Sequence, residues 1–110
     1  MDDAVDIVVP PDPTRDERGA RRVDWTRARI RRGRPARLVP LAVGESESTD
    51  ARQTVTKRWR LRLEPDEHLT PECRVEWQGR TLEVVGKVDE YRNRGTLHHL
   101  EATVALVVDS

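Results

Sequence analysis

Histidine and cysteine are the side chains of this sequence best suited to bind a metal or act as a nucleophile, and their spacing disfavours both roles. His98 and His99 are neighbours in an expected β-strand, where adjacent side chains point to opposite faces, so we do not expect them to share a metal ion. His68 has no cysteine or second histidine at ligand spacing. Cys73 falls on the apolar face of an expected strand, which favours a buried thiol over a reactive one.

Acidic residues and glycines give no stronger sign of catalysis. The 20 acidic residues are spread so evenly that no pair stands out as a general acid and a general base. Gly33, Gly44 and Gly79 are isolated from one another and do not form a phosphate-binding loop. We therefore expect a protein that is not an enzyme, with no catalytic residue, no metal site and no cofactor.

Arginine dominates the polar chemistry of the chain. Ten arginines lie between Arg15 and Arg37. Guanidinium groups pair well with phosphates and carboxylates, so two partners fit: a nucleic acid, or the acidic surface of a neighbouring subunit. Trp25 is the only aromatic residue of this stretch and acidic residues dilute its charge, which favours the subunit interface. The interface candidates, which include a second group farther along the chain, are Arg27, Arg29, Arg31, Arg32, Arg58, Arg60 and Arg62.

The composition of the chain indicates a small domain that is helped by its neighbours. The 110 residues carry 20 basic and 20 acidic groups, which removes the bulk electrostatic argument for binding to nucleic acids or membrane surfaces. A single domain, residues 1–110, is expected, and a domain of this size buries only about 65% of its unfolded surface. Hydrophobic residues make up 35% of the chain, so the core must be small and neighbouring subunits are expected to add stability.

The single cysteine and the lack of long apolar segments bear on where the protein is made. Cys73 has no partner for an intrachain disulfide, which is consistent with synthesis in a reducing cytoplasm. No apolar stretch approaches the roughly 20 residues that span a bilayer. The acidic start of the sequence does not resemble a signal peptide. We therefore expect a protein without a membrane partner.

Alternation of apolar and polar residues predicts a mostly β fold. Gln78-Gly79 fits a tight hairpin turn, since short loops need positive φ and glycine adopts it at little cost. Asn93-Arg94-Gly95 is expected to close a longer loop. The expected strands cover residues 4–9, 36–43, 54–63, 73–77, 80–89 and 96–107. We predict a small six-stranded antiparallel β-barrel, or a barrel-like sandwich, and favour the barrel because closure removes exposed strand edges.

Two long polar segments connect these strands. Residues 10–34 are expected to form a long Arg-rich connection that packs through Trp25, and residues 44–53 a polar inter-strand loop. Connections this long in a small domain are usually functional or disordered.

An ordered set of short segments resembles the phage head–tail joining family, the head-closure or stopper proteins of long-tailed phages. The set covers most of the chain after residue 24. The family usually has an aromatic residue where Leu82 stands, and the Arg-rich stretch before Arg34 has no counterpart. The matching segments are Asp24-Trp25, residues 35–41, Gly44-Glu45, residues 51–53, 59–62 and 69–71, Arg74-Val75, Gly79-Arg80, residues 82–84, Val88-Asp89 and residues 92–97.

The resemblance implies a structural virion protein. Such proteins form a ring, commonly of twelve subunits, between the portal or adaptor proteins and the tail terminator or tail tube. The ring retains packaged DNA, which passes through it without sequence-specific binding. The location implied is the head–tail junction of the virion, after synthesis in the bacterial host cytoplasm, and the isolated chain is expected to be a monomer.

The polar loop takes a role from this resemblance. It lies where such proteins carry a loop that projects into the channel, so its carboxylates would repel DNA phosphates and its hydroxyls would bond from loop to loop. A simple solvated loop is the alternative. The channel or gating residues implied are Glu45, Ser46, Glu47, Ser48, Thr49 and Asp50.

Two other functions stay open from the sequence. One is a tail-side completion protein, similar to a tail terminator, with comparable barrel architecture. The other is a small nucleic-acid-binding protein that acts through the segment from Arg15 to Arg37.

Overall fold

Antiparallel strands dominate the structure, a computed structural model that describes residues 2–12, 14–15, 19, 21–41, 57–65 and 67–107. The helical segment among these residues, a single 3₁₀ turn, does not have the length or apolar character needed to cross a membrane. The elements are β1 (Asp3–Val9), β2 (Thr14–Arg15), β3 (Arg21–Arg22), η1 (Trp25–Arg27), β4 (Arg29–Pro40), β5 (Arg58–Leu63), β6 (Arg74–Trp77), β7 (Arg80–Asn93) and β8 (Thr96–Leu106).

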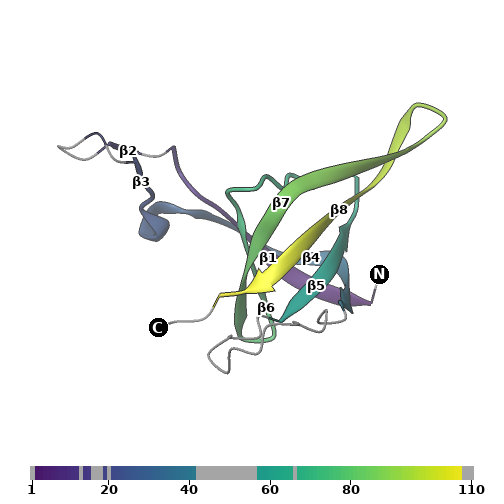
Figure 1. The fold of residues 1–110 in the computed structure, drawn as a ribbon, viewed down its shortest axis with the longest axis horizontal. Helices are drawn as coiled ribbons and strands as arrows, with labels where there is room; N and C mark the ends of the chain where they lie inside the picture. The colour runs from purple at the N-terminus through teal and green to yellow at the C-terminus, as the bar shows by residue number, and fades with distance from the viewer. Residues whose placement is uncertain are drawn as a thin grey trace, which may run out of the picture.

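Six of these strands close into a barrel in the order β1-β4-β5-β8-β7-β6, with β6 pairing back onto β1 (Figure 1). Every pairing in the barrel is antiparallel. The expected six-stranded antiparallel barrel is therefore confirmed. Closure gives each barrel strand a hydrogen-bonded neighbour on both sides for part of its length.

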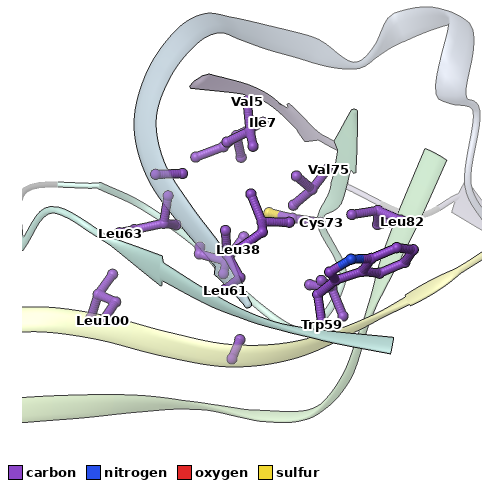
Figure 2. Close-up of a cluster of buried hydrophobic side chains, with 14 residues drawn as sticks. Val5, Ile7, Leu38, Trp59, Leu61, Leu63, Cys73, Val75, Leu82 and Leu100 are labelled. Carbon is purple, nitrogen blue, oxygen red and sulfur yellow. The ribbon is translucent and has the colours of Figure 1, made fainter. Parts of the chain in front are cut away.

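The core follows from the alternation in the sequence. Leu61, Val75 and Leu82 point into the barrel and are 0% exposed (Figure 2). Each such side chain contributes about 1.5–3 kcal/mol by leaving water. Trp59 and Trp77 meet edge to face, with ring centroids 5.6 Å apart. The rest of the buried cluster is Val5, Ile7, Ala36, Leu38, Leu63, Leu69, Cys73, Leu100, Ala102 and Val104, so the expected burial of the Cys73 thiol is confirmed.

The strand after the Arg-rich segment begins earlier than expected. β4 starts at Arg29, whereas the sequence places the strand start at Ala36 and assigns residues 29–34 to the connection. Arginine and glycine hide the strand pattern there, but β1 supplies the hydrogen-bonding partner. Ahead of it, β2 and β3 pair as a two-stranded ribbon that lies away from the barrel (Figure 1).

Trp25 connects the start of this region to the barrel. Asp24 caps η1 by accepting a hydrogen bond from the Thr26 N–H at 3.1 Å. The Trp25 ring then lies under the guanidinium of Arg74 on β6, 4.2 Å from its centroid. The expectation that this segment packs through Trp25 is confirmed, and a cation–π contact is the means.

The β6–β7 turn and the β7–β8 turn each contain two residues. Gln78 and Gly79 have φ values of +51° and +74°, as the tight turn predicted from the sequence requires. Arg94 and Gly95 have φ values of +53° and +82°, and Asn93 pairs with the first residue of β8. The expected longer loop at residues 93–95 is therefore wrong. β7 continues past the barrel as a mostly polar strand, and there it pairs with β8 alone. The two strands form a projecting arm (Figure 1).

Candidate partner-binding surface

The arginine interface candidates fall into two groups on neighbouring parts of the barrel. One group lies on η1 and β4, and the other alternates with buried residues along β5. β4 and β5 pair directly, yet the intramolecular partners of the two groups differ. The first group is Arg27, Arg29, Arg31 and Arg32, and the second is Arg58, Arg60 and Arg62.

Arg31 is bound within the chain by a buried carboxylate. Glu67, between β5 and β6, has a side chain that is 0% exposed. Arg34 Nε donates to Glu67 Oε1 at 2.7 Å, and Arg34 Nη2 contacts the same oxygen. Arg31 Nη1 lies 3.4 Å from Oε2, an atom that accepts no hydrogen bond from the described residues. A buried carboxylate is costly unless it is paired, so these two arginines permit its burial.

A β-bulge in β4 allows both arginines to reach one carboxylate. In a regular strand, residues 31 and 34 would point to opposite faces. Opposite Asp6 of β1, however, β4 contributes two residues for one, and Gly33 there has a φ of +64°. The Gly33 N–H donates to Asp6 Oδ1 at 2.9 Å. The extra residue restores the face, so that Arg31 and Arg34 converge on Glu67.

Arg60 is the centre of a second cluster, on the outer surface of β5, β8 and β7. Its Nη2 donates to Asp89 at 2.9 Å, its Nε to Glu101 at 3.1 Å and its Nη1 to Thr103 at 3.2 Å. The ionic side chains of this cluster are between 22% and 32% exposed. Arg60 therefore mainly links β5, β7 and β8 of the barrel wall. Few of its N–H groups are left to bond a partner protein.

His99 extends this cluster to Arg62. His99 Nε2 lies 2.7 Å from Glu101 Oε2, and Arg62 Nη2 lies 3.2 Å from His99 Nδ1. In the neutral tautomer that fits both contacts, Nε2–H donates to Glu101 and Nδ1 accepts from Arg62. The Tyr91 ring stacks on the imidazole, with centroids 4.7 Å apart. Arg62 thus contacts a histidine and forms no ion pair with the described residues.

The two adjacent histidines lie together, which corrects the expectation that they point apart. His98 Nδ1 is 2.8 Å from His99 Nδ1. The cause is a second irregularity: Tyr91 pairs with His99 and Arg92 with Leu97, so His98 has no partner on β7. A bulged residue loses the regular alternation of faces. Among the described residues, no three His, Cys, Asp or Glu side chains gather as a metal site.

The Arg60 cluster shifts the pKa values of its members. Arg60 holds the pKa of the Asp89 carboxyl below its ordinary value, chiefly by its hydrogen bond. Burial acts to raise the pKa of Glu101, but hydrogen bonds from His99 and Arg60 outweigh it and lower that pKa. The hydrogen bond to Asp89 raises the pKa of Arg60. All three groups are therefore charged at neutral pH.

Other cations on this side of the barrel have no comparable partner. Arg37 and Arg62 are direct cross-strand neighbours on β4 and β5, and like charges in that position repel. With His98 and His99 they line a cleft of about 410 Å³, together with Asp2 and Glu64. Arg32 is 3.7 Å from Asp6 but 73% exposed. Along η1, β4 and β5, the exposed arginines that form no ion pair with the described residues are Arg27, Arg29, Arg37 and Arg58.

Two carboxylates on the opposite side of the barrel are also unpaired within the described residues. Glu76 on β6 and Glu83 on β7 are exposed and alternate with Val75 and Leu82, which are 0% exposed. The sequence indicates their outward orientation through that alternation. It does not indicate that Asp6 of β1 lies beside Glu76, because the pairing of β6 with β1 is tertiary.

The gating loop lies outside the described residues. This applies to all six residues, Glu45, Ser46, Glu47, Ser48, Thr49 and Asp50, which therefore remain predictions from the sequence.

Comparison with known proteins yields a likeness of fold. No family model matches the chain, and no curated protein matches it. The fold is similar to that of the protein xkdH from the phage-like element PBSX of Bacillus subtilis, with a TM-score of 0.50 and 12% sequence identity. The likeness covers 94% of this chain and 92% of that one. At such low identity, what the two chains share is the barrel architecture over nearly their whole lengths.

Proposed function

We propose that this protein is a structural subunit of a phage or prophage particle and acts as a head-closure, or stopper, ring at the head–tail junction. The observation that carries the proposal is the likeness of fold to a protein of a phage-like element over nearly the full length of both chains. The family resemblance of the sequence, from Asp24 to Leu97, points the same way.

The surface of the barrel supports a role in assembly. The β7–β8 arm and the β2–β3 ribbon project from the barrel, and projecting elements of this kind can contact neighbouring subunits (Figure 1). The barrel wall carries charges that find no partner in the described residues. The proposed partners are copies of the chain, in a ring of about twelve by the family resemblance, together with portal or adaptor proteins and tail terminator or tail-tube proteins. DNA passes through the ring without sequence-specific contact.

Electron microscopy of particles made with and without this protein tests the proposal. We expect filled or leaked heads beside free, complete tails when the gene is deleted, and normal virions when the wild-type gene is restored. Filled heads beside incomplete tails would favour the tail-side completion role. Normal virions without the protein would overturn both roles.

The gating role of residues 45–50 has its own test. Deletion of these residues should leave capsids able to fill, but the DNA should escape before tails attach, because the loop is proposed to block the channel. The measurement is the DNA content of tailless heads. A replacement of the same six residues by a Gly/Ser segment of equal length separates the chemistry of the loop from its length. Unchanged DNA retention in both variants would make it a solvated loop.

Nucleic-acid binding is the second candidate, favoured by the exposed Arg27 and Arg29. If it is correct, fluorescence anisotropy with a short DNA duplex should show binding that weakens steeply as salt is added, because each phosphate contact releases counterions. Replacement of both arginines by glutamine should reduce the salt slope. A salt-independent or undetectable signal would exclude this candidate.

A further inference from the structure

We propose that two opposite walls of the barrel, one basic and one acidic, bind each other in successive copies of this chain. The inference rests on the proposed role as a ring subunit and assigns the surfaces that touch within the ring. The basic wall is the outer surface of β4 and β5, with Arg37, Arg58 and Arg62 around Val39. The acidic wall is the outer surface of β6 and β7, with Glu76 and Glu83, and Asp6 of β1 lies at its border.

The basic wall has the composition of an interface. Arg37 and Arg62 face each other across β4 and β5, and Arg58 is exposed at the start of β5. Val39 lies in the neighbouring cross-strand row and is 44% exposed. An apolar centre with a polar rim is the usual anatomy of a protein interface. The repulsion between the two paired arginines is relieved if a carboxylate of another molecule approaches them.

The acidic wall offers that carboxylate. Asp6 of β1 is the direct cross-strand neighbour of Glu76, but Arg32 lies 3.7 Å from Asp6 and offsets part of this contact between like charges. Glu83 is exposed on β7. Arg74 lies in register with Glu83, but its guanidinium stacks on Trp25 instead. Asp6 and Glu76 also line a cleft of about 300 Å³, together with Arg80.

The positions of the two walls favour head-to-tail contact. In the closed order of strands, β5 lies opposite β6, and β4 lies opposite β7. A surface and its complement on opposite sides of one subunit cannot satisfy each other in a twofold dimer, so they pair from copy to copy. Such contacts form a ring where the rotation between copies closes. A second copy is therefore favoured over DNA as the occupant, because the formally neutral chain supplies its own anionic partner and the acidic wall repels phosphate.

Sedimentation velocity of the purified full chain with charge-reversed variants tests the inference. One variant carries Arg37→Glu with Arg58→Glu, and the other carries Glu76→Arg with Glu83→Arg. All four side chains are exposed, and circular dichroism reports whether the fold is kept. The matched control is Lys87→Glu with Arg94→Glu, which makes the same change of charge at exposed positions of the β7–β8 arm, outside both walls. If a reversed variant does not fold, glutamine replacements at the same positions take its place.

We expect the wild type to associate weakly at about 1 mM protein in low salt and to dissociate as salt screens the walls. Each reversed variant should lose at least about tenfold in association constant, because like charges then meet. An equimolar mixture of the two variants should regain the wild-type constant, since a reversed basic wall then meets a reversed acidic wall. The control should behave as the wild type does.

Three results would overturn the inference: a wild type that stays monomeric throughout, a mixture that does not recover, or a basic-wall variant that loses duplex DNA binding while self-association is unchanged. None of these bears on whether particles need the protein. Electron microscopy of the deletion strain answers that separately, so failure of the assigned walls and failure of the proposed function are distinguishable.

Discussion

The two arginine–carboxylate clusters of this barrel use the same chemistry in different surroundings. Glu67 is fully enclosed and is approached by Arg31 and Arg34, whereas Arg60 meets Asp89 and Glu101 on a wall that water reaches. Loss of one partner of a buried pair leaves an uncompensated charge, but a partly exposed pair is screened by solvent. Substitutions in the buried cluster should therefore lower the free energy of unfolding more than substitutions in the wall cluster do.

The largest effect is expected when the buried cluster loses its negative charge. Glu67→Gln keeps the shape of the side chain but leaves Arg31 and Arg34 without their carboxylate. We expect the free energy of unfolding to fall by about 3 kcal/mol, measured by urea denaturation. The matched control is Glu64→Gln, because Glu64 forms no ion pair with the described residues. If Glu67→Gln lowers the free energy of unfolding by less than about 1 kcal/mol, the buried cluster stabilises the fold no more than a solvent-exposed ion pair does.

The bulge that builds the buried cluster should come next in importance. Gly33→Ala places a β-carbon on a residue with φ of +64°, where no neighbouring atom lies within 4 Å, so the cost is that of the backbone conformation alone. We expect a loss of about 1–2 kcal/mol by the same measurement. Gly33→Asn should recover part of it, since asparagine tolerates this conformation better. Equal losses of stability in Gly33→Ala and Gly33→Asn would show that the positive φ of residue 33 is not the cause.

The wall cluster should contribute less, and its contribution should depend on salt. Arg60→Met removes three hydrogen bonds but keeps the apolar stem, and we expect a loss of about 1 kcal/mol at low salt. Screening at about 1 M salt should remove most of that difference. Arg58→Met is the control and should have almost no effect, because Arg58 has no partner among the described residues. A loss of stability in Arg60→Met that is the same at low and high salt would contradict the view that solvent screens the wall cluster.

The smallest effect is a dependence of stability on pH that belongs to the wall. The pKa of Glu101 is lower in the folded protein than its ordinary value, so the folded state binds fewer protons there than the unfolded chain does. This stabilisation is present above the ordinary pKa of a glutamate, about 4.3, and is lost as the pH falls through the lower, folded value. In thermal unfolding below about pH 5, the wild type should lose more stability than Glu101→Gln does. Parallel curves for the two proteins would exclude a role for this carboxyl.

The buried side of the barrel was predictable where the residues alternate. The alternating apolar residues predict the inward face of three strands, through Leu61 and Leu63, through Val75 and Trp77, and through the residues from Leu100 to Val104. The two-residue turn at Gln78-Gly79 is predicted by its glycine. The start of β4 was not predictable in the same way. Arginines and Gly33 occupy positions where an alternating strand would show apolar residues, and only the pairing with β1 identifies them as strand.

The sequence predicted which types of residue form the candidate surface, but it did not predict how these residues are arranged on the barrel. Arg31 and Arg60 were reasonable interface candidates by type, but each finds carboxylates inside its own chain. Arg37 and the acidic residues Glu76 and Glu83 were not singled out, because nothing local distinguishes them from other exposed charges. Their importance comes from the walls on which the barrel places them.

The sequence by itself determined the class of fold, the inward face of most strands and the burial of the single thiol, because these depend on residues close together in the chain. Tertiary structure decided which charges are satisfied. Arg34 reaches Glu67 across 33 residues, and Arg60 reaches Glu101 across 41. Bulges at Gly33 and His98 then change which side chains share a face. A local pattern cannot encode such contacts, because strand order and register are fixed only when the barrel closes.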